Sequence, residues 1–320
     1  MRRPDARGAV PSWTLLAVTL PAVLALVASC SSSVALAPVA RDGRVIQVVA
    51  AENFWGSIAR QVGGRHVHVL SIISNPNTDP HSYEPTAADA RAIALSRLVI
   101  ENGVGYDPWM PRLLAADQGQ QRVLDVGSML GVPADGNPHR WYSPADVRAV
   151  ISRLAAEYAR IDPADKAYYS RRRAYVDTVA LRPYHSLIAT IRARYGGTPV
   201  GASESIFAML APALGLRLIT PYSFLKAISE GTEVSVADKQ VIDHQIRHHL
   251  IRIYVYNSQN LTPDVQAQLA AAKAAHIPVT TITETLAPPS DTFQAWQVRQ
   301  LHGIEAALAR AAALARTTGH

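Results

Sequence analysis

Cysteine is nearly absent from this sequence, since Cys30 is the only one among 320 residues. A single cysteine excludes a disulfide within one molecule and a zinc site built from cysteine ligands. Basic runs interleaved with aromatic side chains are also missing, which argues against nucleic acid as a partner. After residue 30, no stretch is long and apolar enough to span a membrane. The sequence therefore predicts a water-soluble body without disulfides.

The N-terminus has the pattern of an export signal that ends at the cysteine. Three arginines precede an uncharged run from Thr14 to Ala28, which is shorter than the ~20 apolar residues that a membrane-spanning helix needs. We therefore predict a cleaved signal peptide over residues 1–29. The tetrad Val27-Ala28-Ser29-Cys30 matches the bacterial lipobox, after which the cysteine becomes N-terminal and carries acyl chains. The alternative is an ordinary secretory signal with a chance cysteine.

The segment after the cysteine is rich in serine, alanine and proline, and we expect residues 30–43 to be a flexible tether. Removal of residues 1–29 leaves 291 residues, and about +4 of the formal net charge of +6 stays with them. That length suits two lobes of ordinary domain size. The charge is too small to indicate a particular partner.

Short apolar runs, such as the predicted strands Ile251–Val255 and Val279–Ile282, alternate along most of the body with helical stretches such as Ala87–Ala94. This pattern predicts mainly parallel sheets flanked by helices. This alternation stops in the middle of the chain, where residues 166–195 contain no glycine and only one proline, Pro183. This stretch predicts one long helix, kinked at Pro183. We therefore predict the α/β class, with an N-terminal lobe over residues 44–165, a connecting helix over 166–197 and a C-terminal lobe over 198–320.

Two histidines follow prolines in loops that should be stiff: His81 in Asp79-Pro80-His81-Ser82-Tyr83 and His139 in Asn137-Pro138-His139-Arg140-Trp141. Two acids, Glu204 and Glu284, closely follow predicted strands of the second half. Ligands of open parallel sheets bind beyond the carboxyl ends of the strands. Two candidates from each half thus predict a four-ligand metal site in a cleft between the lobes. Imidazole and carboxylate together suit Zn²⁺, Mn²⁺ and Fe²⁺.

Each candidate also has a simpler interpretation. His81 and His139 can be hydrogen-bonded loop histidines, Glu204 can cap the helix that begins near Ser205, and Glu284 can be a solvated loop acid. An envelope metallohydrolase is a competing function. It needs an open coordination position and a general base, whereas four protein ligands close the site. The pair His244 and His248 lacks the glutamate of a zinc-protease helix, so we expect no enzyme.

The chain resembles the metal-binding lipoproteins of bacterial ABC importers, the zinc/manganese solute-binding family (cluster A-I). The resemblance covers essentially the whole mature chain. Its marks are the segments Asp79–Thr86, Asn137–Trp141, Ala227–Glu233 and Thr283–Leu286. It implies two α/β lobes joined by one long rigid helix, with a single divalent transition-metal ion in the cleft as the transported ligand.

By position, the resemblance makes His81 and His139 the first two ligands. Glu204 falls at the third ligand position, which is His in many zinc-type members and Glu in manganese-type members, and Glu284 falls at the fourth, usually Asp. The His-rich acidic loop of zinc-type members is missing between the two histidines. The ion is therefore left open between manganese and zinc, with iron as a third candidate.

The resemblance also implies partners and a location. The protein would deliver its ion to an ABC importer permease as a monomer, held by lipidated Cys30 at the outer face of the bacterial cytoplasmic membrane. An adhesion protein with a structural metal site is the other alternative to transport.

Overall fold

The structure is a computed structural model that describes residues 45–116 and 119–317. The predicted signal peptide, the predicted tether and Cys30 lie outside the described residues. Within these two ranges, no helix combines the length and the apolar character needed to cross a membrane.

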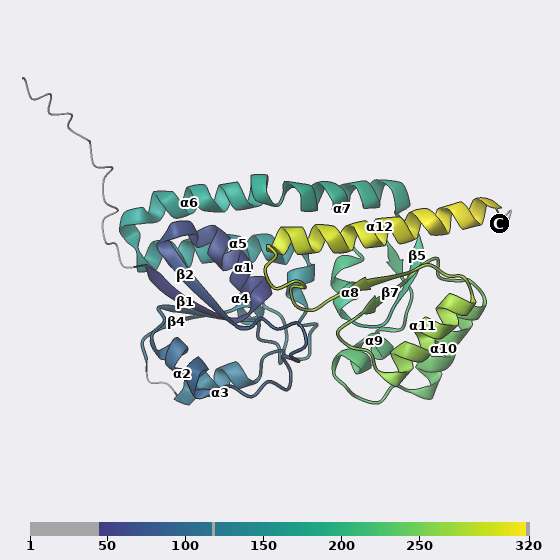
Figure 1. The fold of residues 1–320 in the computed structure, drawn as a ribbon, viewed down its shortest axis with the longest axis horizontal. Coiled ribbons are helices and arrows are strands. Elements are labelled where there is room, and N and C mark those ends of the chain that lie inside the picture. The colour runs from purple at the N-terminus through teal and green to yellow at the C-terminus, as the bar shows by residue number, and fades with distance from the viewer. Residues whose placement is uncertain (1–44, 117–118, 318–320) are drawn as a thin grey trace, which may run out of the picture. The chain divides into compact units, whose positions relative to one another are not determined.

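Two four-stranded parallel sheets form the framework (Figure 1). Their strand orders are β2-β1-β3-β4 and β6-β5-β7-β8, and every pairing is parallel. The strands are β1 (Ile46–Glu52), β2 (Val67–Ile73), β3 (Leu98–Glu101), β4 (Arg122–Asp125), β5 (Pro199–Ala202), β6 (Arg217–Leu218), β7 (Tyr254–Asn257) and β8 (Val279–Ile282). The predicted α/β class, with a parallel sheet in each lobe, is confirmed. We call the parts around the first and second sheets the N lobe and the C lobe.

Helices alternate with these strands and cover the sheets. They are α1 (Asn53–Gly63), α2 (Ala87–Ala94), α3 (Trp109–Ala116), α4 (Val126–Met129), α5 (Pro144–Ile161), α6 (Lys166–Tyr175), α7 (Arg182–Tyr195), α8 (Ile206–Leu210), α9 (Tyr222–Ser229), α10 (Val236–Arg247), α11 (Pro263–Ala274) and α12 (Phe293–Thr317). Short 3-10 turns cover Gly64–His66, Arg140–Tyr142 and Pro163–Asp165. Helix α5 has a defined start, because the Ser143 side chain accepts from the Asp146 amide and Pro144 occupies the first turn.

The long middle segment is helical from Lys166 to Tyr195, with an interruption before Pro183. Residues Val176–Ala180 are π-helical, and the Leu181 amide bonds to the Val176 carbonyl at 3.0 Å. Proline cannot donate to the carbonyl four residues earlier, so the helix changes its hydrogen-bond register just before it. Helices α6 and α7 thus follow each other along one edge of the fold, and α12 packs beside α7 (Figure 1).

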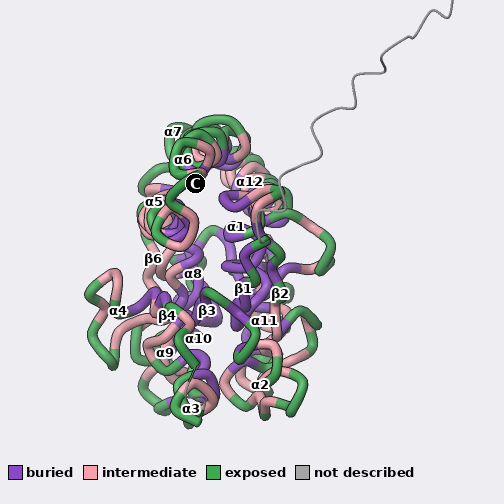
Figure 2. Tube along the Cα trace, turned by 90° about the vertical axis from the view of Figure 1, so that its left-hand side faces the viewer, coloured by how far each residue is buried: buried purple, intermediate pink, exposed green. Residues whose placement is uncertain are grey.

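The apolar core is continuous between the sheets. Both Val48 of β1 and Val200 of β5 belong to one cluster of buried side chains. Figure 2 shows the buried positions concentrated in the strands and the inner faces of the helices, while the outer sides of α6 and α7 are exposed. Near the middle of this core, the Phe54 ring stacks on Trp141 with centroids 3.9 Å apart. This packing supports the loops that carry the candidate site.

Candidate metal site

Three of the four predicted ligands converge. His139, Glu204 and Glu284 each offer one ligand atom, and these atoms all lie within 4.8 Å of one another. The two acids follow β5 and β8 of the C lobe, and His139 lies beside the 3-10 turn Arg140–Tyr142 of the N lobe. All three are buried, with exposed fractions of 0%, 1% and 8% in that order. The convergence of carboxyl-end loops from parallel strands explains how residues so far apart in sequence meet.

The protonation of His139 follows from its partners. Its Nδ1 lies 2.9 Å from Asn137 Oδ1, and the amide nitrogen of Asn137 donates to the Ser205 carbonyl at 2.7 Å. Since Asn137 Oδ1 can only accept, Nδ1 of His139 carries the proton and Nε2 presents its lone pair. Burial first, and then the nearby charge of His81, lower the pKa of His139 to about 3. A neutral imidazole with a free Nε2 is the form that binds metals.

His81 lies near this group but is not one of its three members. Its ring centroid is 4.8 Å from that of Tyr106, which is 5.8 Å from that of His139. The Nε2 atoms of both histidines are buried and have no hydrogen-bond partner among the described residues. A cleft of about 250 Å³ reaches His81 and Glu284 and is lined from both lobes, by Pro76–His81 on one side and by Ile228–Gly231 on the other. His81 therefore lies on the side of the His139–Glu204–Glu284 group that faces the cleft.

The two carboxylates have hydrogen-bond donors on all four oxygens. Asn257 Nδ2 donates to Glu204 Oε2 at 2.6 Å and to Glu284 Oε1 at 2.8 Å. Asn260 Nδ2 donates to Glu204 Oε1 at 3.3 Å, and the Tyr106 hydroxyl donates to Glu284 Oε2 at 2.9 Å. Even so, burial and then the charge of Glu284 raise the pKa of Glu204 well above its ordinary value. Two buried carboxylates at this separation need a cation or a proton between them.

Further hydrogen bonds join the lobes around the group. Gln259 Oε1 accepts from the amides of Glu284 and Thr285 at 2.7 and 3.0 Å, and its Nε2 donates to the Pro76 carbonyl at 2.7 Å. The Tyr142 hydroxyl donates to the Thr283 carbonyl at 2.6 Å. Gln259 thus connects the loop of Glu284 with the loop that leads to His81.

A second set of buried acids lies at the carboxyl edge of the N-lobe sheet. Burial is the largest cause in each: it raises the pKa of Glu52 well above its ordinary value, that of Glu101 to about 8 and that of Asp107 to about 6. Asp107 accepts from the backbone amides of Asn102 and Gly103 at 2.7 and 2.9 Å, which favours its charged form. Through these two bonds Asp107 holds the loop that carries Tyr106.

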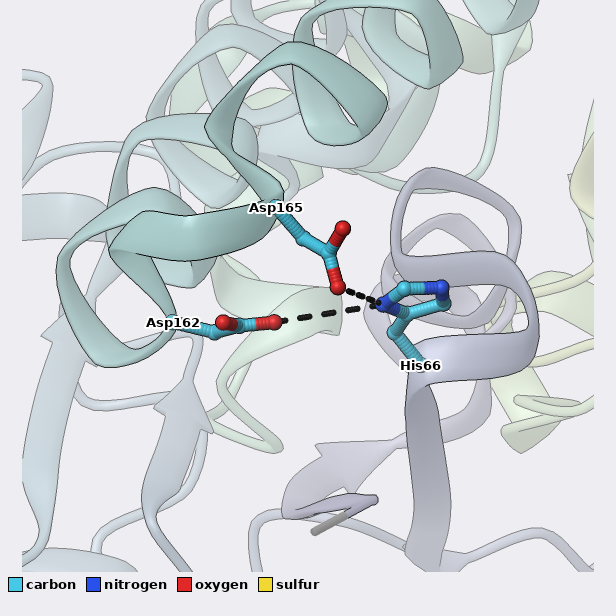
Figure 3. A group of neighbouring side chains, drawn as sticks. All are labelled: His66, Asp162 and Asp165. Atoms are coloured by element: carbon cyan, nitrogen blue, oxygen red, sulfur yellow. Dashed lines mark ion pairs between the residues drawn. The ribbon is translucent and has the colours of Figure 1, made fainter. Parts of the chain in front are cut away.

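Another histidine, His66, faces two aspartates through one ring nitrogen (Figure 3). His66 Nδ1 is 2.9 Å from Asp165 Oδ2 and 3.9 Å from Asp162 Oδ2, and its ring stacks on Tyr168 at 4.1 Å. The Tyr169 hydroxyl donates to Asp162 Oδ2 at 3.0 Å. Each of these three residues has a partner within the cluster, which fastens the turn before β2 to the α5–α6 corner.

Four residues have roles around the site that no sequence pattern had indicated: Asn257, Tyr106, Gln259 and Asn137. Asn257 is the last residue of β7, which was predicted over Ile251–Val255 and is found over Tyr254–Asn257. Glu204 and Glu284 also follow strand ends of the C lobe, and ligands bind at this edge of a parallel sheet. The amide-rich stretch Asn257-Ser258-Gln259-Asn260 after a strand was therefore the available signal in the sequence.

The chain matches known proteins along most of its length. A family model described as ZnuA, zinc-uptake complex component A, periplasmic, matches residues 48–307. The iron-binding protein YfeA of Yersinia pestis is 24% identical over 245 residues, which are 71% of this chain and 73% of that protein. A putative metal-binding protein of Treponema pallidum is 25% identical over 173 residues, and the match covers 47% of this chain and about half of that relative, 54%.

The fold is also shared with solved structures. A manganese-bound mutant of the periplasmic metal binding protein from candidatus Liberibacter asiaticus superimposes with a TM-score of 0.69 at 19% identity, over 82% of this chain and 98% of that one. At this identity the likeness concerns the fold alone, whereas the family model spans most of the sequence. The chain belongs to the family of ZnuA, the periplasmic component A of zinc-uptake complexes.

Proposed function

We propose that this protein captures one divalent transition-metal ion, zinc or manganese with iron as a third candidate, and delivers it to an ABC-type membrane permease. The ion would be held by His81, His139, Glu204 and Glu284 in the cleft between the N lobe, residues 44–165, and the C lobe, residues 198–320, which the helix over 166–197 connects.

The observation that carries the proposal is the convergence of His139, Glu204 and Glu284 from two lobes within 4.8 Å. Two imidazole nitrogens and two carboxylates are a donor set that divalent transition metals prefer. The unpartnered Nε2 atoms of His81 and His139 support it, because a buried polar atom without a partner is costly unless a ligand satisfies it.

We propose further that the protein has no catalytic turnover and acts as a lipid-anchored monomer at the outer face of the cytoplasmic membrane. A metallohydrolase would need a general base and an open position on the metal. Metal binding without hydrolysis of ester, peptide or phosphate substrates is the expected result, and turnover that depends on the bound ion would refute this part of the proposal.

The test is the metal content and affinity of protein purified without added metal. We expect one ion per chain, and His139→Ala or His81→Ala should lower the affinity by orders of magnitude while the fold is retained. His66→Ala is the matched control, because His66 lies in a separate group with Asp162 and Asp165 (Figure 3). Unchanged affinity in the His139 and His81 variants would refute the ligand assignment.

A further inference from the structure

One buried amide links the two acids of the candidate site. Asn257 is fully buried, and its single amide nitrogen donates one hydrogen to Glu204 at 2.6 Å and the other to Glu284 at 2.8 Å. The orientation of this amide is fixed, because its Oδ1 accepts from the Gln259 backbone amide at 2.9 Å. The backbone amide of Asn257 donates to Ser203 Oγ at 3.1 Å. Both hydrogens of the Asn257 side-chain amide are therefore used to hold the acids in place, and its oxygen fixes the orientation of the amide.

The remaining oxygens of the two acids have donors of their own. Tyr106 donates to Glu284 Oε2, and Asn260 donates to Glu204 Oε1. A carboxylate that binds a metal through both oxygens must turn both toward the ion. Donors on both oxygens hold each carboxylate at a fixed angle and leave one oxygen of each within reach of the ion. Three ligand atoms, one from each residue, already lie within 4.8 Å of one another in this arrangement.

We propose that Asn257 is a specificity-determining positioning residue, which restrains Glu204 and Glu284 so that each gives one oxygen to the ion. This inference rests on the proposed function. It adds that Asn257 sets the number of ligand atoms that the protein gives to the ion. Two imidazoles and two single carboxylate oxygens give four ligands, which suits zinc. Release of the carboxylates raises the number of oxygen ligands, which suits manganese.

Asn257 should affect the choice between zinc and manganese more than the ability of the site to bind a metal ion. Sites of nitrogen and oxygen donors bind Zn²⁺ more tightly than Mn²⁺ by intrinsic affinity, and only geometry and supply change that order. Loss of the Asn257 donors should narrow the difference between the Zn²⁺ and Mn²⁺ affinities, because a mobile carboxylate can chelate the larger Mn²⁺ ion through both oxygens. Partners that orient metal ligands typically affect affinity by about 10- to 100-fold. We therefore expect the ratio of zinc to manganese affinity to fall about tenfold or more.

The experiment measures Zn²⁺ and Mn²⁺ affinities of the full chain, by competition with a chelator, for wild type, Asn257→Ala and Asn257→Asp. Asn257→Asp keeps the shape of the side chain and replaces the donor with a carboxylate, so it tests the inference even if Asn257→Ala folds poorly. Gln245→Ala is the matched control, because Gln245 is also buried and its amide donates to the Ile219 carbonyl at 2.7 Å, away from the acids. Circular dichroism of the metal-free proteins confirms folding.

The visible spectrum of Co²⁺-loaded protein gives a readout that a merely structural role would not change. Four-coordinate Co²⁺ absorbs far more strongly than five- or six-coordinate Co²⁺, so both Asn257 variants should lose absorbance and Gln245→Ala should keep it. An unchanged affinity ratio and spectrum in a folded Asn257 variant would overturn this inference alone. Failure of the wild type to bind any of the three ions would instead overturn the proposed function.

Discussion

The hydrogen bond between Tyr106 and Glu284 can be removed with little change in packing. The Tyr106 ring is fully buried, and its centroid lies 4.8 Å from that of Trp141. Tyr106→Phe keeps this ring and removes only the hydroxyl, which donates to Glu284 Oε2 at 2.9 Å. The bond links a loop of the N lobe to a candidate ligand of the C lobe. Its loss should therefore affect both the stability of the fold and the capture of the ion.

The losses of unfolding free energy and of metal affinity can both be estimated for this buried hydrogen bond. A hydrogen bond to a charged group contributes about 1.5–3 kcal/mol net, so the free energy of unfolding of the metal-free protein should fall by about 2 kcal/mol. Without its donor, Glu284 must be oriented by the ion itself. Loss of a group that orients a ligand costs about 10- to 100-fold in metal affinity. We expect the lower end of that range, because Asn257 still holds Glu284 Oε1.

The assay combines urea unfolding of the metal-free protein with Zn²⁺ affinity from chelator competition. Tyr158→Phe is the matched control, because its buried hydroxyl donates to the Ala59 carbonyl at 3.1 Å, away from the candidate ligands. Both variants should lose stability, and only Tyr106→Phe should lose affinity. Equal affinity losses in the two variants, or no loss in Tyr106→Phe, would refute the idea that Tyr106 orients Glu284.

Three further outcomes can be measured on the same protein. Burial raises the pKa of Glu101 from 4.5 to about 8, so the folded state keeps a proton that the unfolded chain releases, and stability falls as the pH rises between these values. Glu101→Gln should therefore gain about 2 kcal/mol over wild type in urea unfolding between pH 5.5 and 7.5, and a pH-independent difference would contradict this. Phe54→Ala removes a fully buried ring that stacks on Trp141 and should lower the free energy of unfolding by about 3–5 kcal/mol, so a loss below about 1 kcal/mol would count against this core. Cys30→Ala should move the protein from the membrane to the soluble fraction of cells, and continued attachment of lipid would disprove the lipobox.

Local sequence patterns were sufficient for the fold class and for much of the secondary structure. The apolar run Val279–Ile282 and the helix Ala87–Ala94 are found over the ranges expected. They were predictable because caps and apolar periodicity act between close neighbours in sequence. Thr86, for example, forms a capping box with Asp89 at the start of α2.

Tertiary contacts decided what these patterns could not. Helix α9, Tyr222–Ser229, was not predicted. Strand β7 begins three residues later than expected, at Tyr254, and ends two residues later, at Asn257, because its pairing with β8 runs from Tyr254 to Asn257. That shift puts Asn257 at the strand end, beside Glu204 and Glu284.

The order of residues along the chain was enough to indicate which side chains could bind a metal: two Pro-His loops and two acids after strands. Their ligand roles stay a prediction. The tertiary structure decided which of them meet, with His139, Glu204 and Glu284 together and His81 at the cleft side. It also decided that one amide and one phenol restrain the acids. The physical reason is that a hydrogen bond between residues up to 178 positions apart leaves no trace in local periodicity, and only packing of the two sheets brings such groups within 3 Å.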